Sequence, residues 1–233
     1  MYLDKLTMSE FRKKVTPSRV VILPIGATEG HGSHLPLSTD TLQPVYVAEQ
    51  VAKRTGALIA PPIYYGNCTA TANFPGTITI SFEALNALVG EVLSELARHG
   101  FRKIVVLSGH AGRLHMAALR LAAERLVRER PEVKIMVLSD YDIAYAMKDP
   151  DIPADDGHAG MIETSRVLAI APRLVKGRAR AAYPKYPPYQ VLSDYRPYFP
   201  TAVHGNPAKA SAKKGKEWNA YIVKELTKLV KAL

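Results

Sequence analysis

The segment from Glu29 to Asp40 combines carboxylate and imidazole side chains at a spacing that suits a metal centre. Glu29 and Asp40 offer oxygen ligands, and His31 and His34 offer ring nitrogens. The segment follows a strongly apolar run at 20–25 that is typical of a buried strand. Oxygen and nitrogen ligands of these kinds bind the divalent metals of hydrolytic enzymes. The sequence therefore predicts a hydrolytic metal centre just past the end of a core strand.

Two further groups of histidines and acids follow other apolar runs. His110 comes directly after the run at 104–107, and the group at 155–163, with His158 at its centre, follows the run at 133–138. In open α/β sheets, ligands bind beyond the carboxyl ends of the strands. We therefore expect these loops to meet the first segment at one edge of the sheet.

The elements that must position these loops follow from the hydrophobic periodicity. Apolar runs predict strands at 20–25, 57–60, 104–107 and 133–138, with a shorter β-prone segment at 77–80. Helical spacing predicts helices at 41–54, 82–98 and 113–129, a short helix at the 155–163 group, and a last helix from about 207 to 233. Strands that alternate with helices predict an α/β fold, a three-layer α/β/α sandwich with a mostly parallel sheet.

Length and composition fit one globular unit. A chain of 233 residues with 47% hydrophobic residues can bury one sizeable core, so we predict a single domain over 1–233. One stretch breaks the alternation of strands and helices. Residues 172–207, which we call the arm, are rich in proline and tyrosine, and we expect an ordered extended segment that packs on the domain or on a neighbouring subunit.

The net charge of +10 is concentrated near the C-terminus. Between Arg173 and Leu233 there are 13 Lys and Arg against 3 acids. Such a field could attract an anionic substrate or nucleic acid, although a solvated lysine-rich helix gives the same pattern. The one cysteine, Cys68, excludes an internal disulfide and suggests a buried thiol in a reducing cytoplasm. With no signal peptide or membrane-length apolar stretch in evidence, we expect a soluble cytoplasmic protein.

Several segments together resemble the creatininase family of amidohydrolases. The segment from Pro24 to Asp40 is similar to that family's hallmark block, and later blocks match in order: Phe74-Pro75-Gly76-Thr77, Ser108-Gly109-His110-Ala111-Gly112, Gly157-His158-Ala159-Gly160 with Glu163-Thr164-Ser165, and Gly205-Asn206-Pro207 with the following 210–215. The similarity runs from about residue 10 to 230.

The resemblance implies a set of site residues. Glu29, Asp40 and His110 match the ligands of one metal, His31 matches a ligand of a second metal, and Asp40 matches the bridge. In creatininase a glutamate completes the second position, but this chain has Gly112 there, so we expect Glu163 to act as that ligand. A single tight metal with a weak second position is the alternative.

Other residues receive roles around the metals. His158 matches a histidine that handles protons at the leaving nitrogen, and we expect Glu163 to take part in catalysis with it. His34 is expected to orient a ligand through its ring N–H. Arg113 and Asp155 are expected to contact the substrate. The cofactors are expected to be one or two divalent ions, and Zn, Fe(II) and Mn remain open because no thiolate ligand is evident.

The resemblance also bears on substrate and assembly. Creatininase covers its small cyclic substrate with tryptophans, whereas the one tryptophan here, Trp218, lies in the C-terminal helix. Another branch, found in archaea, hydrolyses the formamide of a formylaminopyrimidine ribonucleotide in flavin and deazaflavin synthesis. A phosphorylated substrate would suit Arg113 and the arm's cations, among them Arg173, Arg178, Arg180 and Lys185. The family further implies a homo-oligomer, built from dimers and extending to a hexamer.

We therefore predict an amidohydrolase that deformylates such a ribonucleotide. A second candidate substrate is creatinine or another small cyclic amide. A third interpretation is a non-catalytic, metal-stabilised protein that binds nucleic acid through its basic C-terminal region.

Overall fold

The computed structural model describes residues 1–147 and 149–233. Four strands form one sheet: β1 Val20–Ile25, β2 Leu58–Ile59, β3 Lys103–Ser108 and β4 Lys134–Ser139. The α-helices are α1 Met8–Lys14, α2 Thr39–Thr55, α3 Phe82–Arg98, α4 Arg113–Glu129, α5 Asp140–Ala146, α6 Met161–Ile170 and α7 Ala212–Ala232. Short 3₁₀ turns cover Leu3–Lys5, Pro172–Leu174 and Pro207–Lys209.

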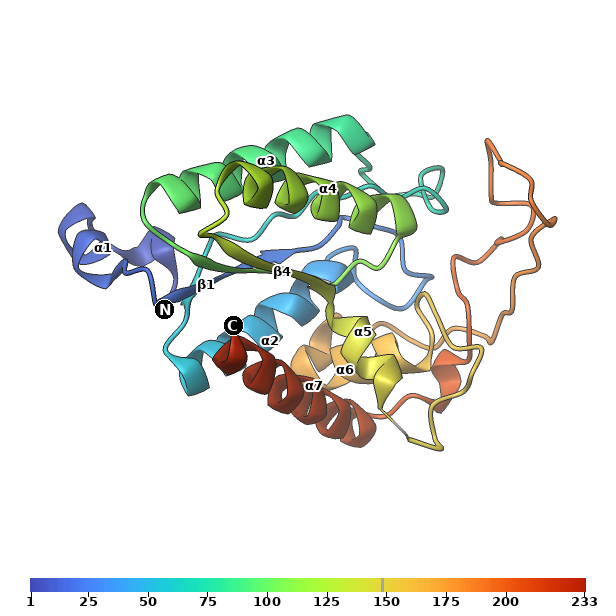
Figure 1. The fold of residues 1–233 in the computed structure, drawn as a ribbon. Coiled ribbons are helices and arrows are strands. Elements are labelled where there is room, and N and C mark those ends of the chain that lie inside the picture. Colours follow the sequence, from blue (N-terminus) through green and yellow to red (C-terminus); the bar gives the residue numbers. More distant parts are fainter. Residues whose placement is uncertain (148) are drawn as a thin grey trace.

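All neighbouring strands of the sheet are parallel, in the order β2-β1-β3-β4. Helices α3 and α4 cover one face, and α2, α5, α6 and α7 lie on the other (Figure 1). Successive strand residues point to opposite faces, so Val21 and Leu23 pack under α3 and α4 while Ile22 packs against α2 and α7. The predicted three-layer α/β fold is confirmed.

Most predicted elements are present, and one is wrong. The segment 77–80 forms no strand; only an isolated bridge joins Ile78 to Thr28. Its backbone N–H groups bond to two different loops: the Ile78 N–H donates to the Thr28 carbonyl, and the Ile80 N–H donates to the Gly66 carbonyl. The short helices α1 and α5 were not predicted.

The arm extends from the body of the molecule beside the carboxyl ends of the strands (Figure 1). After the turn at Pro172–Leu174, the arm has no helix or strand until Pro207. Its base is closed by a pair of backbone hydrogen bonds between Ala182 and Gly205. Among the helices that the structure describes, none is long and apolar enough to cross a membrane.

Candidate metal centre

The strand ends bring the predicted ligands together. Ile25 and Ser108, the last residues of β1 and β3, are paired in the sheet, so the loops that follow them start side by side. The N-terminus of α2 lies against both loops. A Cβ atom at Gly26 would lie 2.5 Å from the Asp40 carbonyl oxygen, and one at Gly109 would lie 2.0 Å from it. Glycine at both positions therefore allows Asp40 to sit between the two strand ends.

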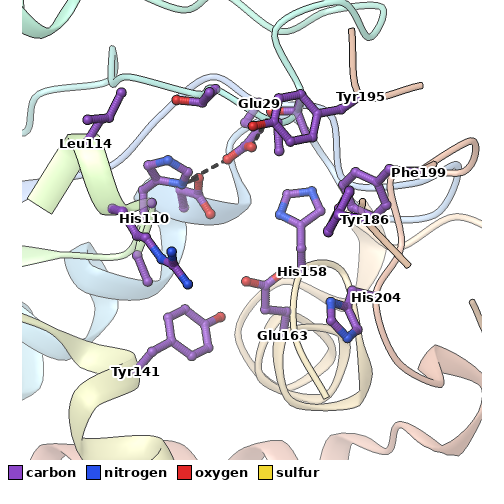
Figure 2. A pocket seen from close by; sticks show the side chains of 18 of the residues that line it. Glu29, His110, Leu114, Tyr141, His158, Glu163, Tyr186, Tyr195, Phe199 and His204 are labelled. Carbon is purple, nitrogen blue, oxygen red and sulfur yellow. Dashed lines mark hydrogen bonds and ion pairs between the residues drawn. The ribbon is translucent and has the colours of Figure 1, made fainter. Parts of the chain in front are cut away.

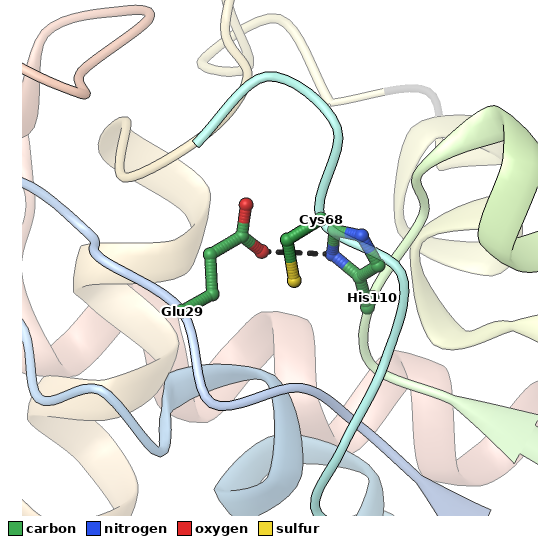
Figure 3. A group of neighbouring side chains, drawn as sticks. All are labelled: Glu29, Cys68 and His110. Carbon is green, nitrogen blue, oxygen red and sulfur yellow. Dashed lines mark ion pairs between the residues drawn. The ribbon is translucent and has the colours of Figure 1, made fainter. Parts of the chain in front are cut away.

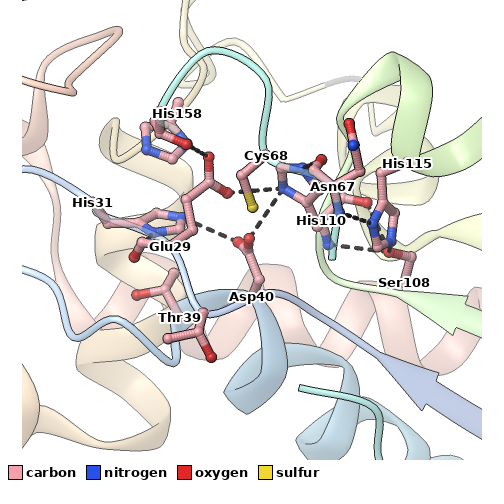
Figure 4. Close-up of polar contacts among 12 residues, drawn as sticks. Glu29, His31, Thr39, Asp40, Asn67, Cys68, Ser108, His110, His115 and His158 are labelled. Carbon is pink, nitrogen blue, oxygen red and sulfur yellow. Dashed lines mark hydrogen bonds and ion pairs between the residues drawn. The ribbon is translucent and has the colours of Figure 1, made fainter. Parts of the chain in front are cut away.

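Glu29, Asp40 and His110 form a first ligand set. The His110 Nδ1 atom lies 2.9 Å from Glu29 Oε2 and 3.0 Å from Asp40 Oδ2. All three side chains are buried. Figure 4 shows them converging on one point from the β1 loop, the start of α2 and the β3 loop.

His31, Asp40 and Glu163 form a second set on the other side of Asp40. The His31 Nε2 atom lies 3.0 Å from Asp40 Oδ1 and 3.5 Å from Glu163 Oε2. The two oxygens of Asp40 therefore face different sets, which is the arrangement of a bridging carboxylate. Gly112 offers no side-chain ligand from the β3 loop, and Glu163 of α6 is the second acid beside His31.

The chemistry of these atoms fits divalent metal ions. Glu29 Oε2 and Asp40 Oδ2 are buried and both face His110 Nδ1, whose single proton can serve only one of them. Buried carboxylates without compensation cost several kcal/mol each. A cation between each set of ligands would remove that cost.

The pKa shifts of the candidate ligands also fit metal binding. Burial opposes ionisation of Glu29, but the positive charges of His110 and His158 outweigh it and hold the Glu29 pKa well below its usual range. Burial also opposes protonation of His31, yet the charges of Asp40 and Glu163 raise its pKa to about 10. Without metal, protons on the histidines balance the carboxylates; bound metal ions would replace those protons.

Four of the five candidate ligands contact a further group outside the two sets. His31 Nδ1 lies 3.0 Å from the Glu29 carbonyl oxygen, and His110 Nε2 lies 3.0 Å from the Asn67 carbonyl oxygen. Glu163 accepts the Ala159 N–H at 2.6 Å, and the Thr71 hydroxyl donates to Glu29. Such partners fix ring orientation and tune the basicity of the ligands.

His34 supports the centre one step further out. Its Nε2 atom lies 2.9 Å from the hydroxyl of Thr164, the residue after Glu163 in α6. Burial, helped by the charges of His31 and His158, lowers the His34 pKa to about 4. His34 therefore stays neutral at physiological pH and braces the helix that carries Glu163.

His158 lies beside the second ligand set. Its ring lies 4.1 Å from the His31 ring, centroid to centroid, and its Nε2 atom lies 2.8 Å from the Gly30 carbonyl oxygen. The carbonyl can only accept, so Nε2 carries a proton and Nδ1 is the atom left for proton exchange. His158 also lines the cavity over the metal centre.

That cavity has a volume of about 760 Å³. Glu29, Asp40, His110 and Glu163 line its floor, and residues of the arm form the facing wall, notably Tyr186, Tyr195 and Phe199 (Figure 2). Arg113, at the first position of α4, lines the cavity from the side of the β3 loop.

Some residues expected near the substrate lie outside the cavity lining. Asp155 is exposed and is not among the residues that line the cavity. The buried acid is its neighbour Asp156, whose carboxylate accepts the Met161 and Ile162 N–H groups at the start of α6. Of the arm's cations, Arg178 and Arg180 line a second cavity of about 510 Å³.

Trp218 lies where the sequence predicted, away from the site. It is buried under the sheet, and its indole N–H donates to Asp149 at 2.6 Å. No sequence pattern indicated the loop at 67–71, in which Asn67 contacts the candidate ligand His110 and Thr71 contacts the candidate ligand Glu29. No spacing rule connects that loop to the strand ends, so only the fold reveals it.

Comparison with known proteins agrees with this geometry. The family model described as "Creatininase: Creatinine amidohydrolase" matches residues 4–230. The chain is 32% identical to creatinine amidohydrolase of Pseudomonas putida over 82% of this chain and 81% of that protein. It is also 32% identical to the mycofactocin precursor peptide peptidase of Mycobacterium tuberculosis over 90% of this chain and 84% of that protein.

Solved structures give the same result. A creatininase mutant of the Zn–Zn type superposes with a TM-score of 0.89 at 28% identity, covering 99% of this chain and 97% of that one. A manganese form of creatininase superposes with a TM-score of 0.87 at 29% identity, with the same coverage.

Proposed function

The chain belongs to the creatininase family and is a metal-dependent amidohydrolase, and we propose that its substrate is a formylaminopyrimidine ribonucleotide, from which it releases formate. The observation that carries the proposal is the composition of the cavity wall. Aromatic rings of the arm face the metal ligands across a space large enough for a nucleotide-sized molecule, with an arginine at one side.

The arginine side of the cavity supports a phosphorylated substrate. Gly112 and Arg113 line the cavity at the N-terminus of α4, and the first turn of that helix contains no acidic residue. Helix N-termini attract anions, and an arginine can bind two phosphate oxygens. Tyr186 and Phe199 on the opposite wall suit stacking on a pyrimidine ring.

We infer that Glu29, Asp40 and His110 hold one metal ion and that His31, Asp40 and Glu163 hold the second. When bound, such a pair polarises a carbonyl and provides a nucleophilic water at neutral pH. The new C–O bond forms at the formyl carbon, and the C–N bond breaks.

The proton steps fall to two residues of the cavity wall. Glu163 faces the reacting centre and accepts a proton from the attacking water. His158 delivers a proton from Nδ1 to the departing nitrogen, while the Gly30 carbonyl holds its other ring nitrogen.

A small cyclic amide is the second candidate substrate, favoured by the 32% identity to the Pseudomonas putida creatinine amidohydrolase. Creatinine itself is disfavoured by the cavity, since the chain's one tryptophan, Trp218, is buried in the core.

The test is formate release from the formylaminopyrimidine ribonucleotide and from its dephosphorylated form, together with metal content. We expect release that requires metal and that disappears in Asp40→Ala. Arg113→Ala should lower kcat/KM about tenfold on the phosphorylated substrate only. Arg178→Ala, which changes the second cavity, is the matched control. Metal binding through Asp40 without formate release would overturn this substrate, and creatinine and other cyclic amides would be assayed next.

We also propose that the chain forms a homo-oligomer based on dimers, with the arm at an interface. Tyr189 and Val191 in the arm are fully exposed, and apolar and tyrosine side chains are enriched at interfaces. A monomer in light scattering would contradict this.

A further inference from the structure

Cys68, the single cysteine of the chain, lies against the first ligand set. Its sulfur, a Glu29 carboxylate oxygen and a His110 ring nitrogen all lie within 4.8 Å of one another (Figure 3). The Cys68 side chain is buried, with 1% exposure. Ligands of one tetrahedral zinc ion lie roughly 3.3–3.8 Å apart, given bonds of about 2.0–2.3 Å. Small movements would therefore bring the sulfur into contact with the same ion.

The loop that carries Cys68 is fixed to the ligands on both sides. The Asn67 carbonyl accepts from His110 Nε2, and the Thr71 hydroxyl donates to Glu29. Between them, the Cys68 N–H donates to the Thr79 hydroxyl at 2.9 Å. Since neighbours of Cys68 hold two ligands of the same set, its position is tied to the geometry of that set.

A second observation points to an ion at this place. Glu29 Oε2 and Asp40 Oδ2 are buried and both face His110 Nδ1, whose single proton can serve only one of them, and Figure 4 draws the Cys68 sulfur between the two carboxylates and the His110 ring. A dication in that space would contact one oxygen of each carboxylate, His110 Nδ1 and the sulfur. Coordination would release the thiol proton to solvent as the metal–sulfur bond forms.

We propose that Cys68 is a thiolate ligand of the metal held by Glu29, Asp40 and His110. Thiolate is a soft ligand, so this position favours Zn²⁺ and other thiophilic ions over Mn²⁺. The second position, with His31, Asp40 and Glu163, has three protein ligands and keeps an open coordination place, as catalytic sites do. The two positions then differ in metal preference. This inference rests on the metal centre of the proposed function and is independent of the formamide substrate.

Cobalt(II) replacement tests the proposal directly. A thiolate ligand gives a sulfur-to-cobalt charge-transfer band in the near ultraviolet, and with one cysteine in the chain the band can come only from Cys68. We expect the band in the wild type and its loss in Cys68→Ser. His31→Gln, which alters only the second position, should retain the band.

Two more measurements keep the proposal open to failure. X-ray absorption of the Zn²⁺-loaded wild type should show a sulfur neighbour at about 2.3 Å, a result that needs no variant to fold. In chelator competition, Cys68→Ser should lower the affinity for Zn²⁺ by at least the roughly 10–100-fold that is lost when a residue that only orients a metal ligand is removed. The decrease in affinity for Mn²⁺ should be smaller.

The failures of this inference and of the proposed function are distinguishable. Stoichiometric metal binding with only oxygen and nitrogen neighbours would show that Cys68 is a packed thiol and overturn this inference alone. Absence of metal binding in the wild type would overturn both.

Discussion

The metal centre and the arm meet across one cavity but are built in opposite ways. Ligands such as His31 and Glu29 are buried, and each is held by a further contact, with the Glu29 carbonyl oxygen for His31 and with the Thr71 hydroxyl for Glu29. In the arm, Tyr189 and Val191 are fully exposed, and the wall residue Tyr186 makes edge contacts with the rings of Tyr195 and Phe199. One side of the cavity is rigid and the other depends on a few ring contacts.

We expect the metal centre to determine the reaction and the arm to determine which substrates fit the cavity. The ligands are placed by the register of β1 and β3 and by the start of α2, all parts of the core. The arm is closed at its base by the Ala182–Gly205 pair and contacts the body at separate points, such as the Phe74 ring on Phe199, and it changes direction without helix or strand. Substitutions in the arm can therefore alter what fits the cavity while the metal centre remains intact, and the predictions below test that separation.

The largest effect is expected at the bridge. Asp40→Asn removes the negative charge that both ligand sets share, so metal content should fall at both positions. Loss of the several kcal/mol that a metal pair contributes corresponds to a decrease in kcat of roughly 1,000-fold or more. Metal analysis and steady-state kinetics measure both. A variant that keeps two metals and normal kcat would show that Asp40 is not the bridge.

A smaller effect is expected at His158, which lies between the two regions. His158→Gln removes the proton donor but no proposed ligand, so kcat should fall roughly 100-fold, within the range of general acid–base catalysis, while metal content is unchanged. A loss of metal in this variant would instead make His158 part of the coordination shell. Its pH–rate profile should also lose one limb.

The sequence predicted the residues of the metal centre for a physical reason. Glu29, His31 and His110 directly follow buried parallel strands, and the edge where such strands end is predictable from chain order. The glycines at 26 and 109 carry a further signal, since each stands where a backbone approaches Asp40. Short helices escaped prediction even though Thr7 with Glu10 and Ser139 with Asp142 form capping boxes.

The sequence was less informative about the surroundings of the centre. Cys68 and Thr71 reach the ligands through a loop with no regular spacing, so nothing in the chain order places them. Asp155 and Asp156 are adjacent in the chain, and local pattern could not decide which of them is buried beneath α6. The direction of the arm's cations depends on its path in space, which composition does not specify.

The free energy of unfolding should depend on pH through His34, a buried residue beside the metal centre. The pKa of His34 is about 4 in the folded protein because of burial, against about 6.5 when unfolded. The unfolded state then binds more protons between these values, so stability is full above pH 6.5 and falls as the pH drops toward 4. At pH 5 the loss from His34 is about 2 kcal/mol.

Urea unfolding at pH 7 and pH 5 measures this loss. His34→Asn should keep a polar contact to Thr164 and show a smaller decrease than the wild type. His99→Asn, at an exposed histidine after α3, is the matched control. Equal pH dependence in the wild type and His34→Asn would mean that His34 is not held neutral by the fold.

The smallest effect is expected in the arm, where a matched pair of tyrosines is available. Tyr186 lines the cavity and contacts Phe199, whereas Tyr183 is exposed and lies outside the cavity wall. Tyr186→Ala removes one aromatic contact with the substrate, so kcat/KM should fall about fivefold through an increase in KM, which corresponds to about 1 kcal/mol for a ring pair. Tyr183→Ala should leave KM unchanged, and both variants should retain wild-type metal content. If Tyr186→Ala lost metal, the arm would contribute to the stability of the centre, and the two sides of the cavity would not be separable.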